Sequence, residues 1–440
     1  MKNNNKENTE KPLVGFFPAF FNIGETAPHV KIAKLYMEKG GKAIFFNHGG
    51  PYEYMAKDIG CEVVKLQYLY WNKVANKKKK IPTEEALFKV YKRETIDAFV
   101  EEEIEVLKEN GVELVMSSFN PTCNISAKVL NIPHVALISG TAMPPYYKSG
   151  FATFPENYEN VFTKILPSSL KNRITQWYLL NNKMLVRDFN KVAKKYHLKP
   201  FRCLTDILLG DHTFVCDDIQ FLGVAPSKEF PLENFIGPII GVNFGKEKEL
   251  DVDIKNHLKK PGKSIFLTMG SYFDRQLFLK ILETLNQTDY KIIVVCTTIV
   301  KKENLPEMND NILVKQFVSS PMAVNKMVDL AITHGGRGTV YTAALSGKPA
   351  IGIPLHMEQQ YNIDNLVRNG TAIRVSRKFF KSQDLLNAID TIFSNYNKFL
   401  TNAQNLATRL SQADAGEKNA VKRLIEIIQE KNIYNDRKCG

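Results

Sequence analysis

The segment DLAITHGGRGTVYTAALSGKPAIGIPLHMEQQ, Asp329–Gln360, contains the pattern that decides the fold. The apolar run LAIT ends before His334, and two glycines follow. A helix-forming stretch then leads to a second apolar run, PAIGIPL, which is followed by Glu358 and Gln359. Short apolar strands that alternate with helices indicate a parallel sheet with helices on both faces.

The same alternation continues on both sides of this segment. SIFLTMGS, KIIVVCTT and NILVKQFV precede it and TAIRVS follows it, each with the character of a buried strand. The first half of the chain contains LVGFFPAFF, KAIFFNHG, CEVVKL, VELVMSS and PHVALIS. From about Thr141 an aromatic and proline-rich stretch and several helices replace the pattern, which we interpret as an insertion. The chain is therefore predicted to contain two open α/β domains.

Composition divides the chain into five parts. The polar residues 1–11 are expected to form a disordered tail. Residues 12–236 form the first domain, the glycine-, proline- and charge-rich residues 237–262 a linker, and residues 263–412 the second domain. Residues 413–440 are predicted to be a helix that packs back on the first domain.

Bulk properties limit the class of partner. The chain has 440 residues, a formal net charge of +13 and a pI of about 9.2. A basic protein suits anionic partners, and the alternative is an ordinary solvated basic surface. Its six cysteines contain no CxxC pair, which predicts reduced thiols and a cytoplasmic protein. No apolar window is long enough to span a membrane.

His334 lies where open parallel sheets bind ligands, beyond the carboxyl end of a strand. Gly335 and Gly336 let a ligand approach the backbone. The helix that starts near Gly338 directs free N–H groups and its positive dipole end toward the same place. This arrangement predicts an anion site, most simply for a diphosphate.

Glu358 and Gln359 follow the next strand. A carboxylate beside an amide offers acceptors and donors that suit hydroxyl groups, and a diphosphate next to hydroxyl groups describes a nucleotide sugar. Each feature also has a structural explanation. A histidine before a glycine turn is often structural, two glycines often only make a turn, and Glu-Gln at a helix start often only caps the helix.

The quoted segment resembles the donor-binding box of the family 1 glycosyltransferases, the UDP-glycosyltransferase-like enzymes with the GT-B fold. That box has the order His-Gly-Gly-x-Gly-Thr, Glu-Ala-Leu, Gly-x-Pro and Pro-x-x-x-Asp-Gln. The likeness extends to FIGP before the linker and to GS after the first strand of the second domain. It implies two Rossmann-like domains facing a central cleft, with the acceptor bound by the first domain and the nucleotide sugar by the second.

The resemblance also implies roles for individual residues. His334, Gly336, Gly338, Thr339 and the pair Gly270–Ser271 would contact the diphosphate, Phe317 and Val318 the nucleobase, and Glu358 and Gln359 the sugar. One position departs from the family: Thr342 replaces the glutamate that holds the ribose hydroxyls. The implied reaction is hexosyl transfer from a UDP-sugar to a hydroxyl group, with no cofactor or metal required.

The catalytic base also departs from the family, because the motif Gly-His-x-x-Pro is replaced by GETAP. Glu25 occupies the histidine position, and Ser118 occupies the position of the aspartate that orients that histidine. A glutamate base needs no aspartate to orient it, so the replacement of the aspartate by Ser118 is consistent with the replacement of the histidine by Glu25. His29, at i+4 on the same helix face, is a second candidate. The third interpretation is that Glu25 only stabilises the helix end and catalysis is lost.

The reaction itself is open to three competing interpretations. The spacing from Gly24 to His29 also occurs in retaining enzymes of this fold, but their Glu-x7-Glu signature is missing from the box, so we favour inversion. A nucleotide-sugar epimerase of the same fold would act on the donor alone. A non-catalytic partner protein would keep the fold without turnover.

Aromatic segments of the first domain, FPAFFNIG, YLYW and GTAMPPYYKSGFATF, predict a small apolar or lipid acceptor. The basic run NKVANKKKK, residues 72–80, would allow peripheral contact with anionic lipid at the inner face of the membrane. A run of this kind can equally be a solvated loop. No nucleic-acid-binding motif is present.

Overall fold

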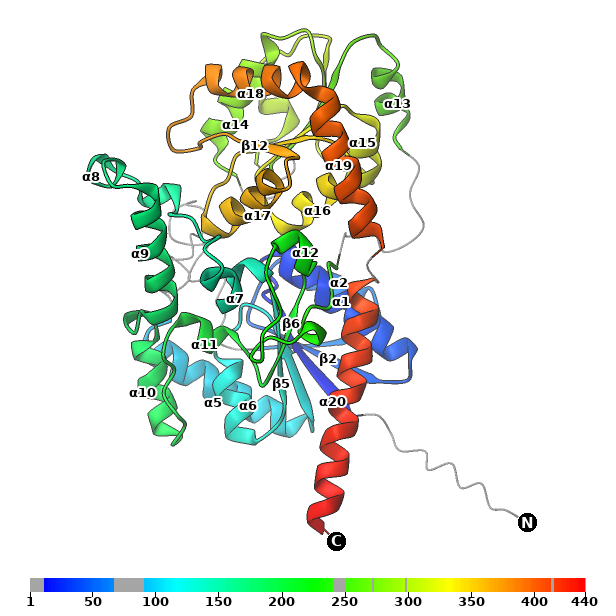
Figure 1. Cartoon of the computed structure of the whole chain (residues 1–440). Helices are drawn as coiled ribbons and strands as arrows, with labels where there is room; N and C mark the ends of the chain where they lie inside the picture. Colours follow the sequence, from blue (N-terminus) through cyan, green and yellow to red (C-terminus); the bar gives the residue numbers. More distant parts are fainter. Residues whose placement is uncertain are drawn as a thin grey trace.

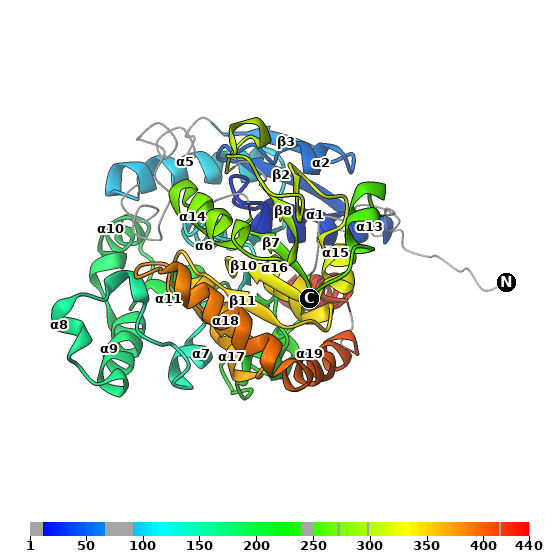
Figure 2. The same ribbon diagram turned by 90° about the horizontal axis from the view of Figure 1, so that it is seen from above.

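The computed structural model describes residues 12–66, 91–239, 250–270, 273–296, 299–412 and 415–439, with side chains to residue 430. It contains two α/β domains, stacked one above the other in Figure 1 and viewed from above in Figure 2. The expected tail at residues 1–11, Ser271, and the segments YLYW and NKVANKKKK lie outside the described residues.

The N-terminal sheet has six parallel strands in the order β3-β2-β1-β4-β5-β6. Its strands are β1 (Leu13–Phe17), β2 (Lys42–Asn47), β3 (Glu62–Lys65), β4 (Leu114–Ser117), β5 (His134–Ile138) and β6 (His212–Val215). Five of them were expected from apolar runs. The sixth, β6, was not expected, because its four residues are preceded by a long helical insertion and followed by two aspartates.

Helices cover both faces of this sheet. The described helices of this domain are α1 (Ile23–Glu38), α2 (Tyr54–Lys57), α5 (Arg93–Glu109), α6 (Cys123–Leu130), α7 (Pro144–Lys148), α8 (Val161–Lys164), α9 (Ser168–Asn181), α10 (Arg187–Lys195), α11 (Leu204–Leu208) and α12 (Ile219–Leu222), of which α8 and α9 project away from the sheet (Figure 1). Helix α1 begins at Ile23, where the Asn22 side chain accepts from the Gly24 N–H and caps it. Glu25 and His29 therefore lie in its first two turns.

The C-terminal sheet also has six parallel strands, in the order β12-β11-β10-β7-β8-β9. All six were expected: β7 (Ser264–Thr268), β8 (Lys291–Val295), β9 (Ile312–Lys315), β10 (Leu330–Thr333), β11 (Ala350–Gly352) and β12 (Ala372–Arg374). Its helices are α13 (Val252–Leu258), α14 (Arg275–Asn286), α15 (Pro321–Met327), α16 (Arg337–Leu345), α17 (Met357–Arg368), α18 (Ser382–Ser394) and α19 (Tyr396–Ser411). Helix α13 falls within the range 237–262 expected as linker, and its Ile254 joins the core of this domain.

Both sheets are doubly wound, and each reverses its strand order at one point. The reversal lies between β1 and β4 in the first sheet and between β7 and β10 in the second. Ligands of doubly wound sheets bind in the crevice beyond the carboxyl ends of the strands at this point. Glu25 follows β1, and Gly270 and His334 follow β7 and β10, so these three candidate residues lie at the reversal points.

The last helix, α20 (Gly416–Cys439), returns to the N-terminal domain and packs along α1 (Figure 1). It buries Ala420, Val421, Leu424 and Ile427 in the same core cluster as Val30 and Ala33 of α1. The start of α20 also touches the chain that leaves the first domain, because the Asn419 amide donates to the Ile236 carbonyl at 2.9 Å. The two segments that connect the domains, near Ile236 and Asn419, therefore lie side by side.

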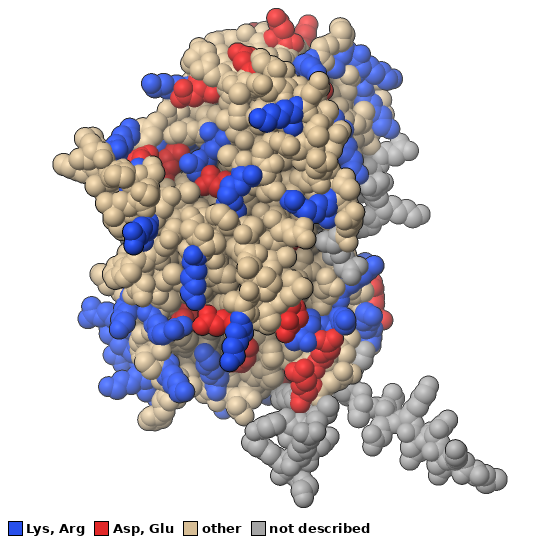
Figure 3. Space-filling view, in the orientation of Figure 1, with Lys and Arg blue, Asp and Glu red and all other residues tan. Residues whose placement is uncertain are grey.

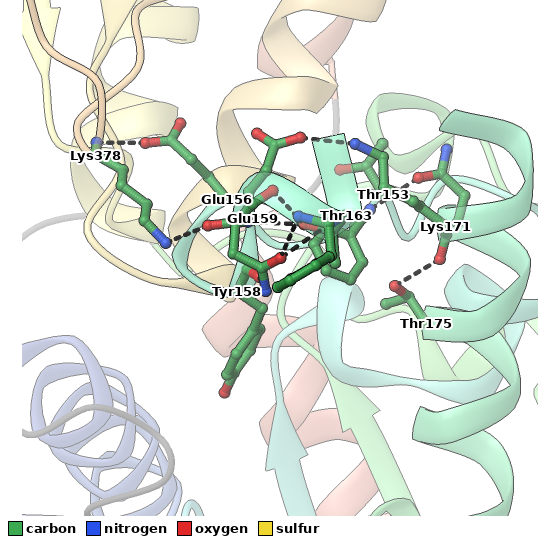
Figure 4. Close-up of polar contacts among 12 residues, drawn as sticks. Thr153, Glu156, Tyr158, Glu159, Thr163, Lys171, Thr175 and Lys378 are labelled. Carbon is green, nitrogen blue, oxygen red and sulfur yellow. Dashed lines mark hydrogen bonds and ion pairs between the residues drawn. The ribbon is translucent and has the colours of Figure 1, made fainter. Parts of the chain in front are cut away.

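A polar interface joins the domains along α17. The Gln360 amide donates to the Thr153 hydroxyl at 2.8 Å, and the Tyr361 hydroxyl donates to the Thr153 carbonyl at 3.0 Å. Glu156 accepts from the Ser376 hydroxyl at 2.9 Å, and Lys378 donates to the Glu159 carbonyl (Figure 4). The segment 140–154, which was expected to offer acceptor-binding aromatics, thus contacts the second domain through Thr153, and also through the Tyr146 hydroxyl, which donates to Asn365 at 3.0 Å.

The described part of the chain contains neither a membrane span nor a metal cluster. None of its helices is both long and apolar enough to cross a membrane. Its His, Cys, Asp and Glu side chains include no group of three placed to hold a metal ion. The five cysteines with described side chains are buried and form no disulfide.

Candidate active site

His334 lies between two glycines that follow neighbouring strands. A Cβ atom on Gly270 would come within 2.5 Å of the imidazole Cε1, and one on Gly336 within 2.6 Å of Nε2. The ring therefore fits only because both positions lack a side chain. Burial, aided by the nearby His356, lowers the pKa of His334 to about 3. Its Nδ1 is buried without a hydrogen-bond partner among the described residues, as expected of a group that binds a ligand.

Helix α16 begins directly after this glycine turn, with Gly336 as its N-cap. The first N–H groups of a helix have no partner within the helix, so they are directed at the space beside His334. The Thr339 hydroxyl is already used: it donates to the Gly336 carbonyl and accepts from Thr333, each at 2.8 Å. Thr339 can therefore offer a phosphate its backbone N–H more readily than its hydroxyl.

Gly335 fixes the distance between this turn and α17. Its φ of +89° favours glycine, and a Cβ there would meet the Gln359 carbonyl at 2.6 Å. Asn362 of α17 donates to the Gly335 carbonyl at 3.1 Å. These contacts fix the position of the predicted anion site relative to the start of α17.

The two residues expected at the sugar differ in burial. Glu358 lies in the first turn of α17 and is partly buried. The Gln359 side chain is buried, and its Oε1 accepts from the Leu355 N–H at 2.9 Å. In this structure Gln359 therefore caps its own helix, which agrees with the structural explanation for that residue.

The residues expected at the nucleoside lie along the outer part of the same sheet. Phe317 follows the edge strand β9 and is 63% exposed, so its ring is open to stacking. Val318 packs partly into the core. The Thr342 hydroxyl donates to the Gly338 carbonyl at 2.6 Å, which leaves it only an acceptor for a ribose hydroxyl.

Glu25 faces the second domain across the reversal points. The Arg337 guanidinium, at the first position of α16, donates to the Gly24 carbonyl at 3.0 Å. This contact places Glu25 beside the amino end of α16. The Glu25 side chain is partly exposed, as a base that meets an acceptor must be.

His29 has a different environment. It is fully buried, its Nδ1 donates to the Glu25 backbone carbonyl at 2.9 Å, and burial lowers its pKa to about 4. His29 is thus linked to the backbone of Glu25 and not to its carboxylate. Ser118, at the family's aspartate position, is also buried. His29 is held in the N-terminal core, whereas Glu25 is not.

The second domain matches a known sequence family. A model of the glycosyltransferase family 28 C-terminal domain matches residues 264–424. Human UDP-glucuronosyltransferase 2B10 is 23% identical over 317 residues, which cover 66% of this chain and 56% of the human protein. The PGL/p-HBAD biosynthesis rhamnosyltransferase of Mycobacterium bovis is 22% identical over 350 residues, 77% of this chain and 73% of that protein. The chain thus aligns with little more than half of the human relative's length.

The fold itself is shared with solved glycosyltransferases. The structure of glycosyltransferase VinC in complex with DTDP superposes with a TM-score of 0.64 and 14% identity over 95% of this chain and 100% of that chain. The chain has the GT-B fold of these proteins, and its second domain is similar to the glycosyltransferase family 28 C-terminal domain. The resemblance drawn from the donor box and the expected two-domain α/β architecture are confirmed.

Two charged residues of this site, Arg337 and Asp217, were not singled out by sequence reasoning. Arg337 stands in the variable position of the box, HGGRGT. Asp217, which follows β6, is buried, and burial raises its pKa although Arg337 acts in the opposite direction. It accepts from the Gly140 N–H at 2.6 Å. Because β6 was not expected, the sequence contained no signal that would place Asp217 in the cleft.

Arg337 is a cation with several acidic side chains near it. Its burial opposes the charge, but Cys216 and the carboxylates of Glu25, Asp217 and Glu358 outweigh this and raise its pKa. One guanidinium nitrogen, Nη1, is buried without a hydrogen-bond partner among the described residues. A cation with a buried, unused donor at the amino end of a helix is placed to meet an anion.

Gly338 provides a direct test of the predicted diphosphate site. A Cβ at this position meets no protein atom within 4 Å, and its backbone is helical. We expect Gly338→Ala to raise the free energy of unfolding by roughly 0.5–1 kcal/mol, because alanine is the better helix former. We expect nucleotide affinity to fall, because the ligand would occupy the space of the new methyl group. Chemical unfolding and calorimetric titration with UDP measure the two effects.

Gly347→Ala is unsuitable as its control, since Gly347 has a φ of +66°. Ser346→Ala, at the C-cap of the same helix, is preferable. Unchanged UDP affinity in Gly338→Ala would show that the diphosphate does not lie against α16.

Proposed function

We propose that this glycosyltransferase moves a hexose from a UDP-sugar to a hydroxyl group of a small apolar or lipid acceptor, with inversion at the anomeric carbon. Glu25 acts as the base. Support comes from the order of groups along the C-terminal sheet. Phe317 follows β9, the anion site lies between β7 and β10, and Glu358 follows β11. This order matches base, diphosphate and sugar in a nucleotide sugar.

The spacing of the strands supports the same assignment. Three strand intervals separate β9 from β10, or about 14 Å at the usual distance between neighbouring strands. An extended nucleoside diphosphate fits this span. The sugar would then lie over β11 beside Glu358, close to the segment 153–157 that packs against α17.

In the proposed reaction the acceptor oxygen attacks the anomeric carbon while the Glu25 carboxylate takes the acceptor proton. The bond between the anomeric carbon and the diphosphate oxygen breaks, and UDP leaves with the bonding pair. The amino end of α16, His334 and Arg337 would stabilise the negative charge that develops on the diphosphate. This set of groups accounts for the charge without a metal ion or cofactor, and we propose that none is required.

The nucleotide is the least constrained part of the donor. Thr342 lacks the carboxylate that would hold two ribose hydroxyls, and its own hydroxyl donates to Gly338. The human relative is named a UDP-glucuronosyltransferase, whereas VinC was solved with DTDP. We propose UDP as the nucleotide, and a deoxynucleotide is the alternative that the Thr342 environment allows.

We further propose a cytoplasmic location, with the run 72–80 in contact with anionic lipid at the inner face of the membrane. An apolar acceptor held at a lipid surface would be within reach of the N-terminal domain. The partners are the donor, the acceptor and the lipid surface, and they include no nucleic acid.

Thermal unfolding with added nucleotides tests the donor site. A ligand that binds only the folded state stabilises it by about 2.7 kcal/mol at a concentration of 100 Kd. We therefore expect UDP or one UDP-sugar to raise the melting temperature clearly, and dTDP less. His334→Ala should lose most of the shift.

Three outcomes would redirect the proposal. A larger shift with dTDP would reassign the nucleotide. No shift with any nucleotide would favour a non-catalytic partner protein. Conversion of a UDP-sugar to its epimer without an acceptor would favour an epimerase.

A further inference from the structure

The exposed apolar side chains of the molecule are concentrated in one place. Seventeen large hydrophobic residues are exposed in the described part of the chain, and ten of them lie between Tyr158 and Met184. We call residues 158–184, which contain α8 and α9, the α8–α9 arm. Figures 1 and 2 both show it at the periphery of the molecule, outside the helices that flank the sheets. Patches of this kind mark interaction surfaces.

Helix α9 has its apolar side turned outward. Leu170, Ile174, Trp177 and Tyr178 follow one another at helical spacing and are all exposed. The buried side of the helix instead contains Lys171, Thr175 and Leu179. A helix that packed only against its own domain would show the reverse distribution. Its outer face therefore lacks the apolar partner for which its side chains are suited.

The arm is held firmly in this orientation. Lys171 forms an ion pair with Glu159 at 2.6 Å, and Asn160 and Thr163 form a capping box at the start of α8 (Figure 4). Leu179 joins a core cluster of the N-terminal domain. Lys378 of the second domain donates to the carbonyls of Asn157 and Glu159. The exposed apolar face is thus a built feature and not a loose segment.

Positive charge surrounds the apolar face. Between Asn160 and Pro200 the chain has nine Lys and Arg residues and a single acid, Asp188. The exposed cations are Lys164, Arg173, Lys183, Arg187, Lys191, Lys194, Lys195 and Lys199. Figure 3 shows the arm as mostly uncharged, with Lys and Arg gathered below it on the N-terminal domain.

We propose that the α8–α9 arm docks on an anionic membrane surface. An apolar face containing Trp and Tyr with a basic border is the composition that binds the boundary between lipid headgroups and acyl chains. Lysine is depleted at interfaces between proteins, whereas here it is abundant. The charge distribution therefore favours an anionic bilayer over a second protein chain. The α8–α9 arm does not include the basic run 72–80, and the assignment does not depend on which acceptor the enzyme uses.

Docking would also orient the cleft. The arm continues directly from residues 153–157, which contact α17 near the sugar site. With α8 and α9 in the headgroup layer, the mouth of the acceptor domain would open close to the bilayer. A lipid acceptor could then enter without passing through water.

Co-sedimentation of the full chain with vesicles tests the proposal. The vesicles contain phosphatidylcholine alone or phosphatidylcholine with phosphatidylglycerol. We expect binding to the second kind only, weakened by salt. The double variant Phe162→Ser with Ile165→Ser, at side chains that are 80% and 81% exposed, should reduce partitioning at least about tenfold.

Two matched controls separate docking from a general loss of apolar surface or charge. Leu232→Ser with Val252→Ser changes side chains that are 59% and 71% exposed outside the arm, and should bind normally. Arg173→Glu with Lys183→Glu should weaken binding, whereas the same charge change at Arg275 and Lys301 should have a smaller effect. Equal melting temperatures of all variants would confirm that each is folded.

Tryptophan fluorescence reports the contact directly. The chain has two tryptophans, so Trp71→Phe leaves Trp177 as the single reporter. A blue shift on addition of anionic vesicles is expected. Failure of the full chain to bind them would overturn the proposal. It would also be overturned if the arm variant abolished self-association, measured by light scattering, while lipid binding stayed unchanged.

Discussion

Replacing Glu25 by glutamine is expected to lower turnover by about 10²–10⁴-fold while UDP affinity stays nearly unchanged. The amide has the shape of the carboxylate but cannot take a proton from the acceptor hydroxyl. Glu25 lies in the first turn of α1, in the N-terminal domain, so its replacement leaves the donor box of the second domain intact. Steady-state kinetics with a saturating donor and calorimetric titration with UDP measure the two quantities.

Glu38→Gln is the matched control for this change, because Glu38 is exposed at the other end of the same helix. His29→Gln distinguishes the second candidate. Because His29 is buried and donates to a backbone carbonyl, we expect its replacement to lower the free energy of unfolding. The pH dependence of turnover should change little. Normal turnover in Glu25→Gln, with a large loss in His29→Gln, would reverse the assignment of the base.

Replacing Arg337 by methionine is expected to lower kcat/KM by roughly 10²–10³-fold, the range found when one donor to a developing negative charge is removed. Methionine keeps the aliphatic length but removes both the contact with Gly24 and the positive charge among Glu25, Asp217 and Glu358. Lysine should restore part of the activity, because it restores the charge without the planar donor pair.

The measurement must separate chemistry from folding. Loss of the hydrogen bond to Gly24 should cost about 2 kcal/mol of stability, since it is a bond from a charged donor. Arg202→Met removes an exposed guanidinium that pairs with Asp206 far from the cleft and serves as the control. A wild-type kcat/KM in a folded Arg337→Met variant would exclude Arg337 from the reaction.

Much of the second domain follows from its sequence. Each of its strands is an apolar run between turn residues, and the glycines around His334 occupy positions where a Cβ would collide with the imidazole or with α17. Local packing therefore requires glycine at these positions of the donor box, and their spacing can be recognised in the sequence. Gln359 is an exception, since its bond to Leu355 depends on how the helix begins.

The first domain was less predictable for physical reasons. Strand β6 is only four residues long, so its apolar pattern is too short to stand out, and Asp217 was missed with it. Both faces of helix α9 contain apolar residues, and the more apolar face of a helix normally packs inward. In the structure the side with Trp177 faces outward, and Lys171 on the buried side pairs with Glu159, a contact that periodicity does not reveal.

The return of α20 has a consequence for synthesis of the protein. Its residues Ala420, Val421, Leu424 and Ile427 complete a core that otherwise belongs to the first half of the chain. While the ribosome is still adding the second domain, one side of that core has no cover. Domains usually fold in the order in which they emerge. Here the earlier domain acquires its final helix only after the later one has been translated, so truncation near the C-terminus should affect a sheet encoded at the opposite end of the gene.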